Sequence, residues 1–165
     1  MLEEPLEAAW PEWFEFWTQI EWTEPAPHDL LFSGGIREDQ TAKLYSIVAR
    51  AKNEWWPYYI GMTEQQAVSN RLQQSDHVER LERLRSAHPN LNFSVCLGTP
   101  TSIRGTLCRD TVGAIEGLLI YANWHEDMDN SRKINRFSNQ RQIYVQNTGW
   151  TEHLEKEVAY GVLYR

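Results

Sequence analysis

Residues 43–50 read Lys-Leu-Tyr-Ser-Ile-Val-Ala-Arg, and residues 56–61 read Trp-Pro-Tyr-Tyr-Ile-Gly. Both segments are rich in β-branched and aromatic residues, which favour extended chains, and a loop around residues 51–55 separates them. We therefore predict that they form a β-hairpin. This hairpin decides the fold, because the elements that follow it must pack around it.

The segments after the hairpin alternate between helical and strand patterns. Thr63 and Gln66 form a capping-box pattern that predicts a helix start, and Asp76 with Glu79 repeats this signal before a second helical segment over residues 77–87. The other expected elements are three strands and one long apolar helix, at residues 93–97, 142–146, 158–164 and 111–124 respectively. We predict an α/β fold of the α+β type, with a small mixed β-sheet flanked by helices.

The net charge of −7 is unevenly distributed. Residues 1–40 carry ten acidic residues and one basic residue, whereas residues 41–165 carry thirteen acidic and fifteen basic residues. The overall charge therefore neither supports nor excludes a polyanionic partner such as DNA.

An aromatic pattern distinguishes the N-terminal part of the chain. The aromatic residues at helical spacing within residues 10–22 are Trp10, Trp13, Phe14 and Trp17. We expect an N-terminal helical arm that packs on its own domain, or on a second copy in a homodimer. We divide the chain into an acidic aromatic-rich arm (1–40), a main domain (41–136) and a C-terminal strand extension packed on that domain (137–165).

The sequence also gives expectations about cellular compartment. It contains no run of about 18 apolar residues, so no membrane span is expected. Its N-terminus is acidic and lacks an apolar stretch, which argues against a secretory signal and favours the cytoplasm. Cys96 and Cys108 are too few for a disulfide scaffold and are expected to be buried, reduced thiols. The five histidines show no zinc-binding spacing.

Glu116 in the long apolar helix requires an explanation. It is the only carboxylate between Asp110 and Glu126, and most of its neighbours are apolar. Moving an ionised carboxylate out of water is costly unless a cation or a hydrogen-bond donor meets it. We therefore expect Glu116 to bind a cation, with solvent or an arginine as the alternative partner.

The hairpin resembles the two motif strands of the GIY-YIG nuclease superfamily. The first strand keeps the motif tyrosine as Tyr45, while Lys43 and Leu44 replace its glycine and isoleucine. Tyr59-Ile-Gly61 matches the second motif. The resemblance places Tyr59 in a catalytic site, although a buried aromatic side chain would also explain it.

Three later residues fit the same superfamily, and the resemblance spans residues 43–132. Arg71 follows in the next helix, Glu116 lies in the apolar helix, and Asn130 stands 14 residues after Glu116. By resemblance, Asn130 would position the phosphate or the loop near Glu116. The superfamily often adds a histidine one turn past the arginine, but His77 stands six residues on, so its role requires a break in the helix at residue 76.

The resemblance implies a metal-dependent endonuclease that hydrolyses phosphodiester bonds in DNA with one Mg²⁺ or Mn²⁺ ion. Tyr45 would be the general base or would orient the nucleophile, provided that nearby cations such as Lys43 and Arg71 lower its pKa from about 10. Arg71 would hold the phosphate oxygens, and Glu116 would be the sole protein carboxylate on the metal. The alternative is an inactive fold of this type that binds nucleic acid or protein.

Several other residues have two interpretations. Trp55 and Trp56 stack on bases or pack under the N-terminal arm. The acidic residues 126, 127 and 129 bind a cation or, as the favoured interpretation, form a solvated loop. Basic residues that line a DNA-backbone surface, or simply form solvated faces, are Arg80, Arg83, Arg85, Arg132, Lys133, Arg136 and Arg141.

Overall fold

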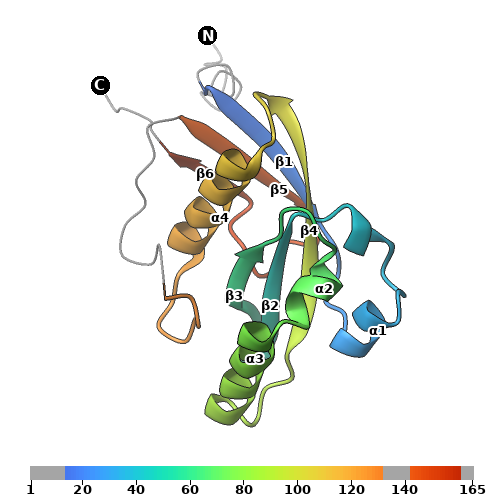
Figure 1. The fold of residues 1–165 in the computed structure, drawn as a ribbon. Coiled ribbons are helices and arrows are strands. Elements are labelled where there is room, and N and C mark those ends of the chain that lie inside the picture. Colours follow the sequence, from blue (N-terminus) through green and yellow to red (C-terminus); the bar gives the residue numbers. More distant parts are fainter. Residues whose placement is uncertain (1–13, 132–141, 161–165) are drawn as a thin grey trace.

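The computed structural model describes residues 14–131 and 142–160. Within these ranges six strands form one mixed sheet in the order β3-β2-β4-β1-β5-β6 (Figure 1). The strands are β1 (Phe16–Trp22), β2 (Leu44–Ala51), β3 (Glu54–Met62), β4 (Ser94–Arg104), β5 (Ile143–Gly149) and β6 (Glu157–Tyr160). The helices are α1 (His28–Phe32), the 3-10 turn η3 (Arg37–Gln40), α2 (Val68–Leu72), α3 (Ser75–Ala87) and α4 (Arg109–Asn123). The predicted mixed sheet with flanking helices is confirmed.

The predicted hairpin is present as β2 and β3, but its loop is shorter than expected. The strands pair out to Ala51 and Glu54, so only Lys52 and Asn53 remain in the turn. Both turn residues have positive φ, 51° and 69°. Two consecutive residues in this region allow a tight turn that matches the twist of the strands.

The expected N-terminal helix is wrong for residues 16–22, which form β1. This strand lies inside the sheet, antiparallel to β4 and parallel to β5. The side chains of Phe16, Thr18, Ile20 and Trp22 are buried, and exposed or half-buried residues alternate with them. This period of two is the strand pattern, and the aromatic residues at helical spacing concealed it. Trp10 and Trp13 lie outside the described residues.

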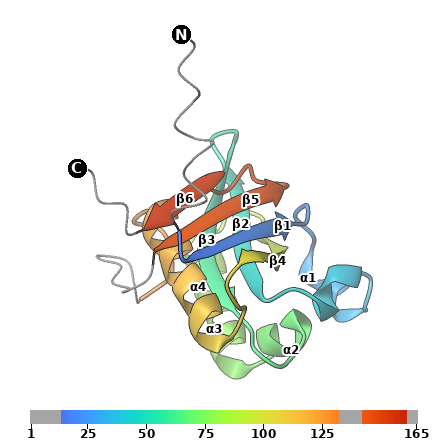
Figure 2. The ribbon, with the colours of Figure 1, turned by 90° about the horizontal axis from the view of Figure 1, so that it is seen from above.

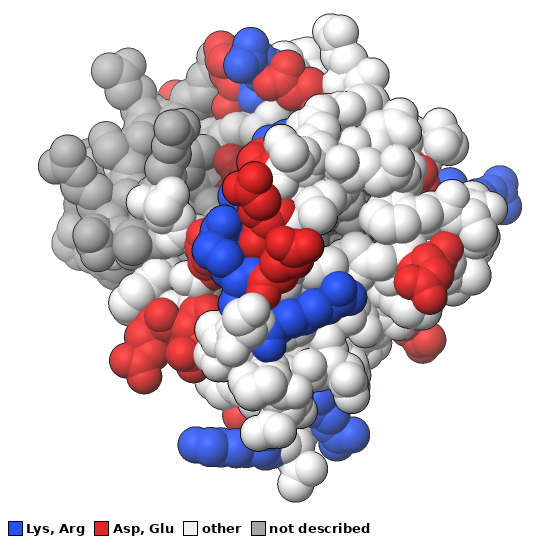
Figure 3. Space-filling model, turned by 60° about the horizontal axis from the view of Figure 1, so that its bottom comes forward, with Lys and Arg blue, Asp and Glu red and all other residues white. Residues whose placement is uncertain are grey.

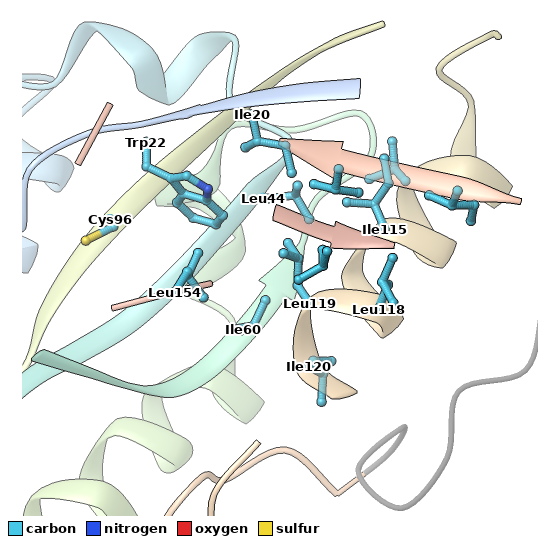
Figure 4. Close-up of a cluster of buried hydrophobic side chains, with 14 of the residues drawn as sticks. Ile20, Trp22, Leu44, Ile60, Cys96, Ile115, Leu118, Leu119, Ile120 and Leu154 are labelled. Carbon is cyan, nitrogen blue, oxygen red and sulfur yellow. The ribbon is translucent and has the colours of Figure 1, made fainter. Parts of the chain in front are cut away.

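Helix α4 covers one face of the sheet. Its apolar side chains, including Ile115, Leu118 and Leu119, form a core with residues of both the central and the outer strands (Figure 4). Because this core includes Ile60 on edge strand β3 and Val158 on edge strand β6, the sheet must curl around α4. In the view of Figure 2, β6, β5 and β1 follow one another across the sheet beside α4.

The other face of the sheet packs against α1, α2 and α3. Tyr45 and Leu97 lie in one cluster with Val68 and Leu72 of α2, and Ile47 lies in a second cluster with residues of α3. Successive residues of β2 therefore face opposite helical layers. Residues Leu44 to Ala49 are all buried. Among the described residues no helix is long and apolar enough to cross a bilayer.

The region between β3 and α3 differs from the predicted helix start. The Thr63 hydroxyl donates to the carbonyl of Gln66 (2.8 Å) instead of accepting from a helix amide, and α2 begins only at Val68. A break follows α2, and α3 begins at Ser75. His77 could belong to the site only if the helix was interrupted before it, and this break interrupts it.

The two cysteines are free, but only one of them is buried as expected. Cys96 lies in the core, whereas Cys108 is exposed at the N-cap of α4. Hydrogen bonds with Thr111 lower the pKa of the Cys108 thiol. A helix cap lies at the surface even when the helix is apolar, which explains the difference.

Candidate active site

Tyr45 lies at the centre of the candidate site, over the glycine of the second motif. It is fully buried on β2, and its register partner on β3 is Gly61. A Cβ atom at Gly61 would stand 2.5 Å from the Tyr45 phenol carbon and oxygen. A glycine is therefore required here, because any side chain would collide with the phenol.

Tyr59 and His77 complete a cluster of three rings around Tyr45. The Tyr59 ring centroid lies 6.0 Å from that of Tyr45, and the His77 ring lies edge-on to both at 5.7 Å. His77 stands in the first turn of α3 and is 2% exposed. The helix break therefore brings His77 to the two predicted tyrosines.

The hydrogen bonds of His77 fix its tautomer. Nη1 of Arg80 lies 2.7 Å from Nδ1, and a guanidinium can only donate, so Nδ1 is the acceptor. In the neutral ring the proton then resides on Nε2, which lies 3.2 Å from the Tyr45 hydroxyl oxygen. Burial, followed by Arg71 and Arg80, lowers the pKa of His77 to about 4. His77 is therefore neutral at physiological pH and donates to Tyr45.

Arg80 and Asp129 belong to the site but were not predicted as site residues. The Arg80 guanidinium carbon lies 3.9 Å from the Tyr59 ring centroid, and Nε lies 3.1 Å from Oδ2 of Asp129. Arg83 donates to the same oxygen (2.7 Å). Arg80 stands three residues after His77, on the same helical face, and this spacing was the available signal. The expected solvated loop around residue 129 is therefore wrong for Asp129, which is ion-paired.

Arg71 is the cation of the site that reaches solvent. It lies at the end of α2, bonded to the Gln74 side chain and 3.5 Å from Oδ2 of Asp76. Its side chain is 29% exposed and that of Asp76 is 53% exposed. An ion pair this exposed contributes little free energy, so another anion can replace Asp76 at Arg71.

Glu116 approaches from the helix on the other face of the sheet. It is half-buried on α4, which packs against edge strand β3. Its charge raises the pKa of Tyr59, after the larger effect of burial, so the carboxylate and the phenol interact electrostatically. The charge of Glu116 therefore acts on Tyr59 from the α4 side of edge strand β3.

The donor chemistry at Glu116 fits a hydrated divalent cation. Mg²⁺ prefers oxygen ligands and keeps several water molecules, so one carboxylate can suffice as protein ligand. Within residues 14–131 and 142–160, no group of three or more His, Cys, Asp or Glu side chains is arranged to hold a metal. A metal on Glu116 would therefore be completed by water and substrate oxygens.

Asn130 is fully engaged with the backbone of β3. Its Nδ2 donates to the carbonyl of Ile60 (2.9 Å), and its Oδ1 accepts from the Ile60 amide (3.0 Å). The neighbouring Asp129 amide donates to the Tyr58 carbonyl (2.7 Å). Asn130 therefore fastens the loop after α4 along the edge strand, with one bond at each of its amide atoms.

Lys43 lies apart from the ring cluster. It precedes β2, and its ammonium group donates to the backbone carbonyl of Glu64 (3.2 Å). The charges that affect the pKa of Tyr45 are those of Tyr59, Arg71 and Arg80. The expectation that Lys43 lowers the pKa of Tyr45 from the same strand face is therefore wrong.

The pKa of Tyr45 is raised, not lowered as expected. Desolvation by burial is the largest cause, and it outweighs the opposing effects of Arg71 and Arg80. The sequence showed the cations but not the depth at which the phenol is buried. A buried neutral phenol is suited to orienting a water molecule, which was the other expected role of Tyr45.

Charge on the molecular surface is mixed. Figure 3 shows a face on which basic and acidic side chains lie next to one another near the centre, while most of the remaining surface is uncharged. Arg80 and Arg83 are paired with Asp129, and only Arg85 of these three is a solvated helix residue without that partner. The basic residues 132, 133, 136 and 141 lie outside the described residues.

Comparisons of the chain with models of protein families, with curated proteins and with solved structures find no match.

Proposed function

We propose that this protein is a divalent-metal-dependent endonuclease of the GIY-YIG type that hydrolyses phosphodiester bonds in DNA. The observation that carries the proposal is the convergence of Tyr45, Tyr59 and His77 on one hydrogen-bonded cluster. Arg71 borders this cluster on the solvent side and Glu116 borders it at the sheet edge. The resemblance covers β2, β3, β4 and the helices α2 to α4, and β1, β5 and β6 extend the sheet beyond it.

The side chains divide the reaction between them. Arg71 would exchange Asp76 for the non-bridging oxygens of the scissile phosphate and neutralise their charge. His77 donates from Nε2 to the Tyr45 oxygen, so the Tyr45 hydrogen is directed to another acceptor, which in the unliganded chain is the Tyr59 hydroxyl oxygen. In the complex the acceptor would instead be the attacking water, which Tyr45 holds in line with the phosphorus atom. Arg80, held by Asp129, keeps His77 in the donating tautomer.

Glu116 would hold the metal from the other side. A Mg²⁺ or Mn²⁺ ion bound there would act as a Lewis acid on the phosphate and the leaving oxygen. Tyr59 is hydrogen-bonded to Tyr45 and its pKa is raised by the charge of Glu116, and Arg80 lies against its ring. Tyr59 would therefore fix the position of the metal on Glu116 relative to the water molecule held by Tyr45.

The proposal is tested by incubating the full chain with Mg²⁺ or Mn²⁺ and supercoiled or branched DNA. We expect nicking or cutting that requires the metal, and a loss of about 10²-fold or more in Arg71→Ala and Glu116→Ala, since each removes charge stabilisation of the transition state. Arg85→Ala and Glu79→Ala, on the exposed face of α3, are the matched controls and should cleave as the unaltered chain does. Intact DNA under all these conditions would overturn the proposal.

A fold that binds but does not cleave is the second candidate function. The raised pKa of Tyr45 and the ion pair of Arg71 favour it, because both describe a site that is stable without substrate. Binding of DNA that depends on Arg71 but is followed by no cleavage with either metal would support this candidate.

A further inference from the structure

A second hollow lies at the opposite end of α4 from the candidate active site. It has a volume of about 580 Å³. Its walls are the tip of the β2–β3 hairpin, the C-terminal end of α4 and the connection between β5 and β6. The size is that of a pocket for a small molecule or a single side chain.

The hollow combines carboxylates with indole rings. Three carboxylates line it, those of Glu54, Glu152 and Glu155, and the described residues that line it include no lysine or arginine. Trp55, Trp56 and Trp124 also line it, and the last two are 39% and 43% exposed. Indole faces and carboxylates together attract organic cations.

Helix α4 adds to the negative potential. It ends at Asn123, beside the hollow, and has no basic residue in its last turn. The carbonyl end of a helix carries a partial negative charge that cations stabilise. A phosphate group would be repelled here, so the hollow is unsuited to the DNA backbone.

His153 supplies an unused hydrogen-bonding group in the same wall. It is 3% exposed and lines the hollow, stacked on Trp150 at 5.0 Å and edge-on to Trp22 at 5.3 Å. Among the described residues, neither of its ring nitrogens has a hydrogen-bond partner. A buried polar group without a partner costs free energy, so a ligand that reached a His153 nitrogen and bonded to it would recover that free energy.

We propose that this hollow binds an organic cation that carries N–H groups, an alkylammonium or a guanidinium. A neutral imidazole has one acceptor nitrogen, and a cationic N–H is the strongest donor it can receive. The carboxylates and the helix end supply the charge, and the indole faces cover the alkyl part. This proposal does not depend on DNA cleavage.

The test follows the tryptophan indole N–H signals of the full chain by NMR while butylammonium or butylguanidinium is added. We expect saturable shifts with dissociation constants in the millimolar range, while 1-butanol, which has the same alkyl chain and no charge, produces no saturable shift. His153→Phe keeps the ring stacking and should weaken binding roughly tenfold or more, because a hydrogen bond to a charged group is lost.

Surface variants keep the test independent of folding. Glu152→Gln and Glu155→Gln should each weaken binding about two- to fivefold, as expected for exposed charges, and Glu79→Gln on α3 should not. A blocked peptide with one arginine that binds more tightly than butylguanidinium would identify the source as a partner's basic side chain, and equal or weaker binding would identify a free small cation. Shifts that do not saturate, equal binding of 1-butanol, or unchanged affinity in the glutamate variants would overturn the proposal.

Discussion

Two buried histidines in this molecule have opposite environments. His77 in the ring cluster is 2% exposed and His153 at the second hollow is 3% exposed. His77 lies between Arg80 and Tyr45, each within hydrogen-bonding distance, whereas the described residues offer His153 only aromatic surfaces. Burial is the largest cause of the lowered pKa of both rings, and Arg71 and Arg80 add to it only at His77, where the polar network also fixes which nitrogen carries the proton.

The different environments of the two histidines indicate where chemistry can be expected in the unliganded chain. An imidazole with a fixed tautomer and a fixed orientation can act on a substrate without rearranging. An imidazole with unused nitrogens can instead accept a partner that the chain does not supply. We therefore assign orientation of the reacting groups to His77 and ligand recognition to His153.

The largest effect is expected for a substitution that removes the hydrogen bond of His77. His77→Phe keeps a ring in the cluster but removes the donor to Tyr45, and DNA cleavage should fall by about 10²-fold, the usual effect of misplacing a group that orients the reactants. Cleavage rates of the folded variant measure this effect. His88→Phe, at the end of α3, is the matched control. Near-normal cleavage by a well-folded His77→Phe variant would show that the network is structural only.

An intermediate effect concerns acid stability. Burial lowers the pKa of His77 to about 4 and that of His153 to about 3, from an ordinary value of 6.5. Below pH 6.5 the unfolded rings bind protons that the folded rings do not, so the free energy of unfolding should fall by a few kcal/mol as the pH decreases from about 6.5 to 4.

Urea unfolding at several pH values distinguishes the two histidines. His153→Phe has no ring to titrate, so it should change stability little at pH 7.5 and be more stable than the unaltered chain at pH 4.5. The variant and the unaltered chain share all carboxylates, so their difference isolates the histidine. Parallel curves for the two proteins would show that His153 is not buried as a neutral ring.

The smallest effect is expected when one hydrogen-bond partner of His77 is removed. Arg80→Leu removes the donor to Nδ1 and the cation over Tyr59, at an expected cost of about 1–3 kcal/mol. The pKa of His77 should rise, because a neighbouring positive charge is lost. An NMR titration of the His77 ring measures the shift, and Arg85→Leu is the exposed control on the same helix. An unchanged pKa would remove Arg80 from the network.

The local part of the fold was predictable from sequence. The β2–β3 hairpin, α3 and α4 have patterns that arise from neighbouring residues, and the glycine of the second motif is explained by contact with Tyr45. Strand β1 was not predicted, because its aromatic residues fit a helical spacing as well as a strand spacing. Only its neighbours β4 and β5, which are distant in sequence, decide between the two.

Most residues of the candidate site could be predicted from the sequence, but most of their contacts could not. Tyr45, Tyr59, His77 and Arg71 come together around the predicted cluster. The partners of His77 could not be found in the same way, since Asp129 meets Arg80 across 49 positions of the chain. The sequence also does not reveal how deeply Tyr45 is buried. This burial raises the pKa of Tyr45, which was expected to be lowered.

The position of β1 constrains the order in which the molecule can be assembled. The strand is synthesised early, yet its two partners are β4, which begins at Ser94, and β5, which begins at Ile143. During synthesis β1 must therefore wait, unpaired, until β4 has emerged, and its other edge stays unpaired until β5 follows. Truncation before Thr23 would divide the sheet into a three-stranded piece, β3-β2-β4, and a two-stranded piece, β5-β6, which have no shared ladder.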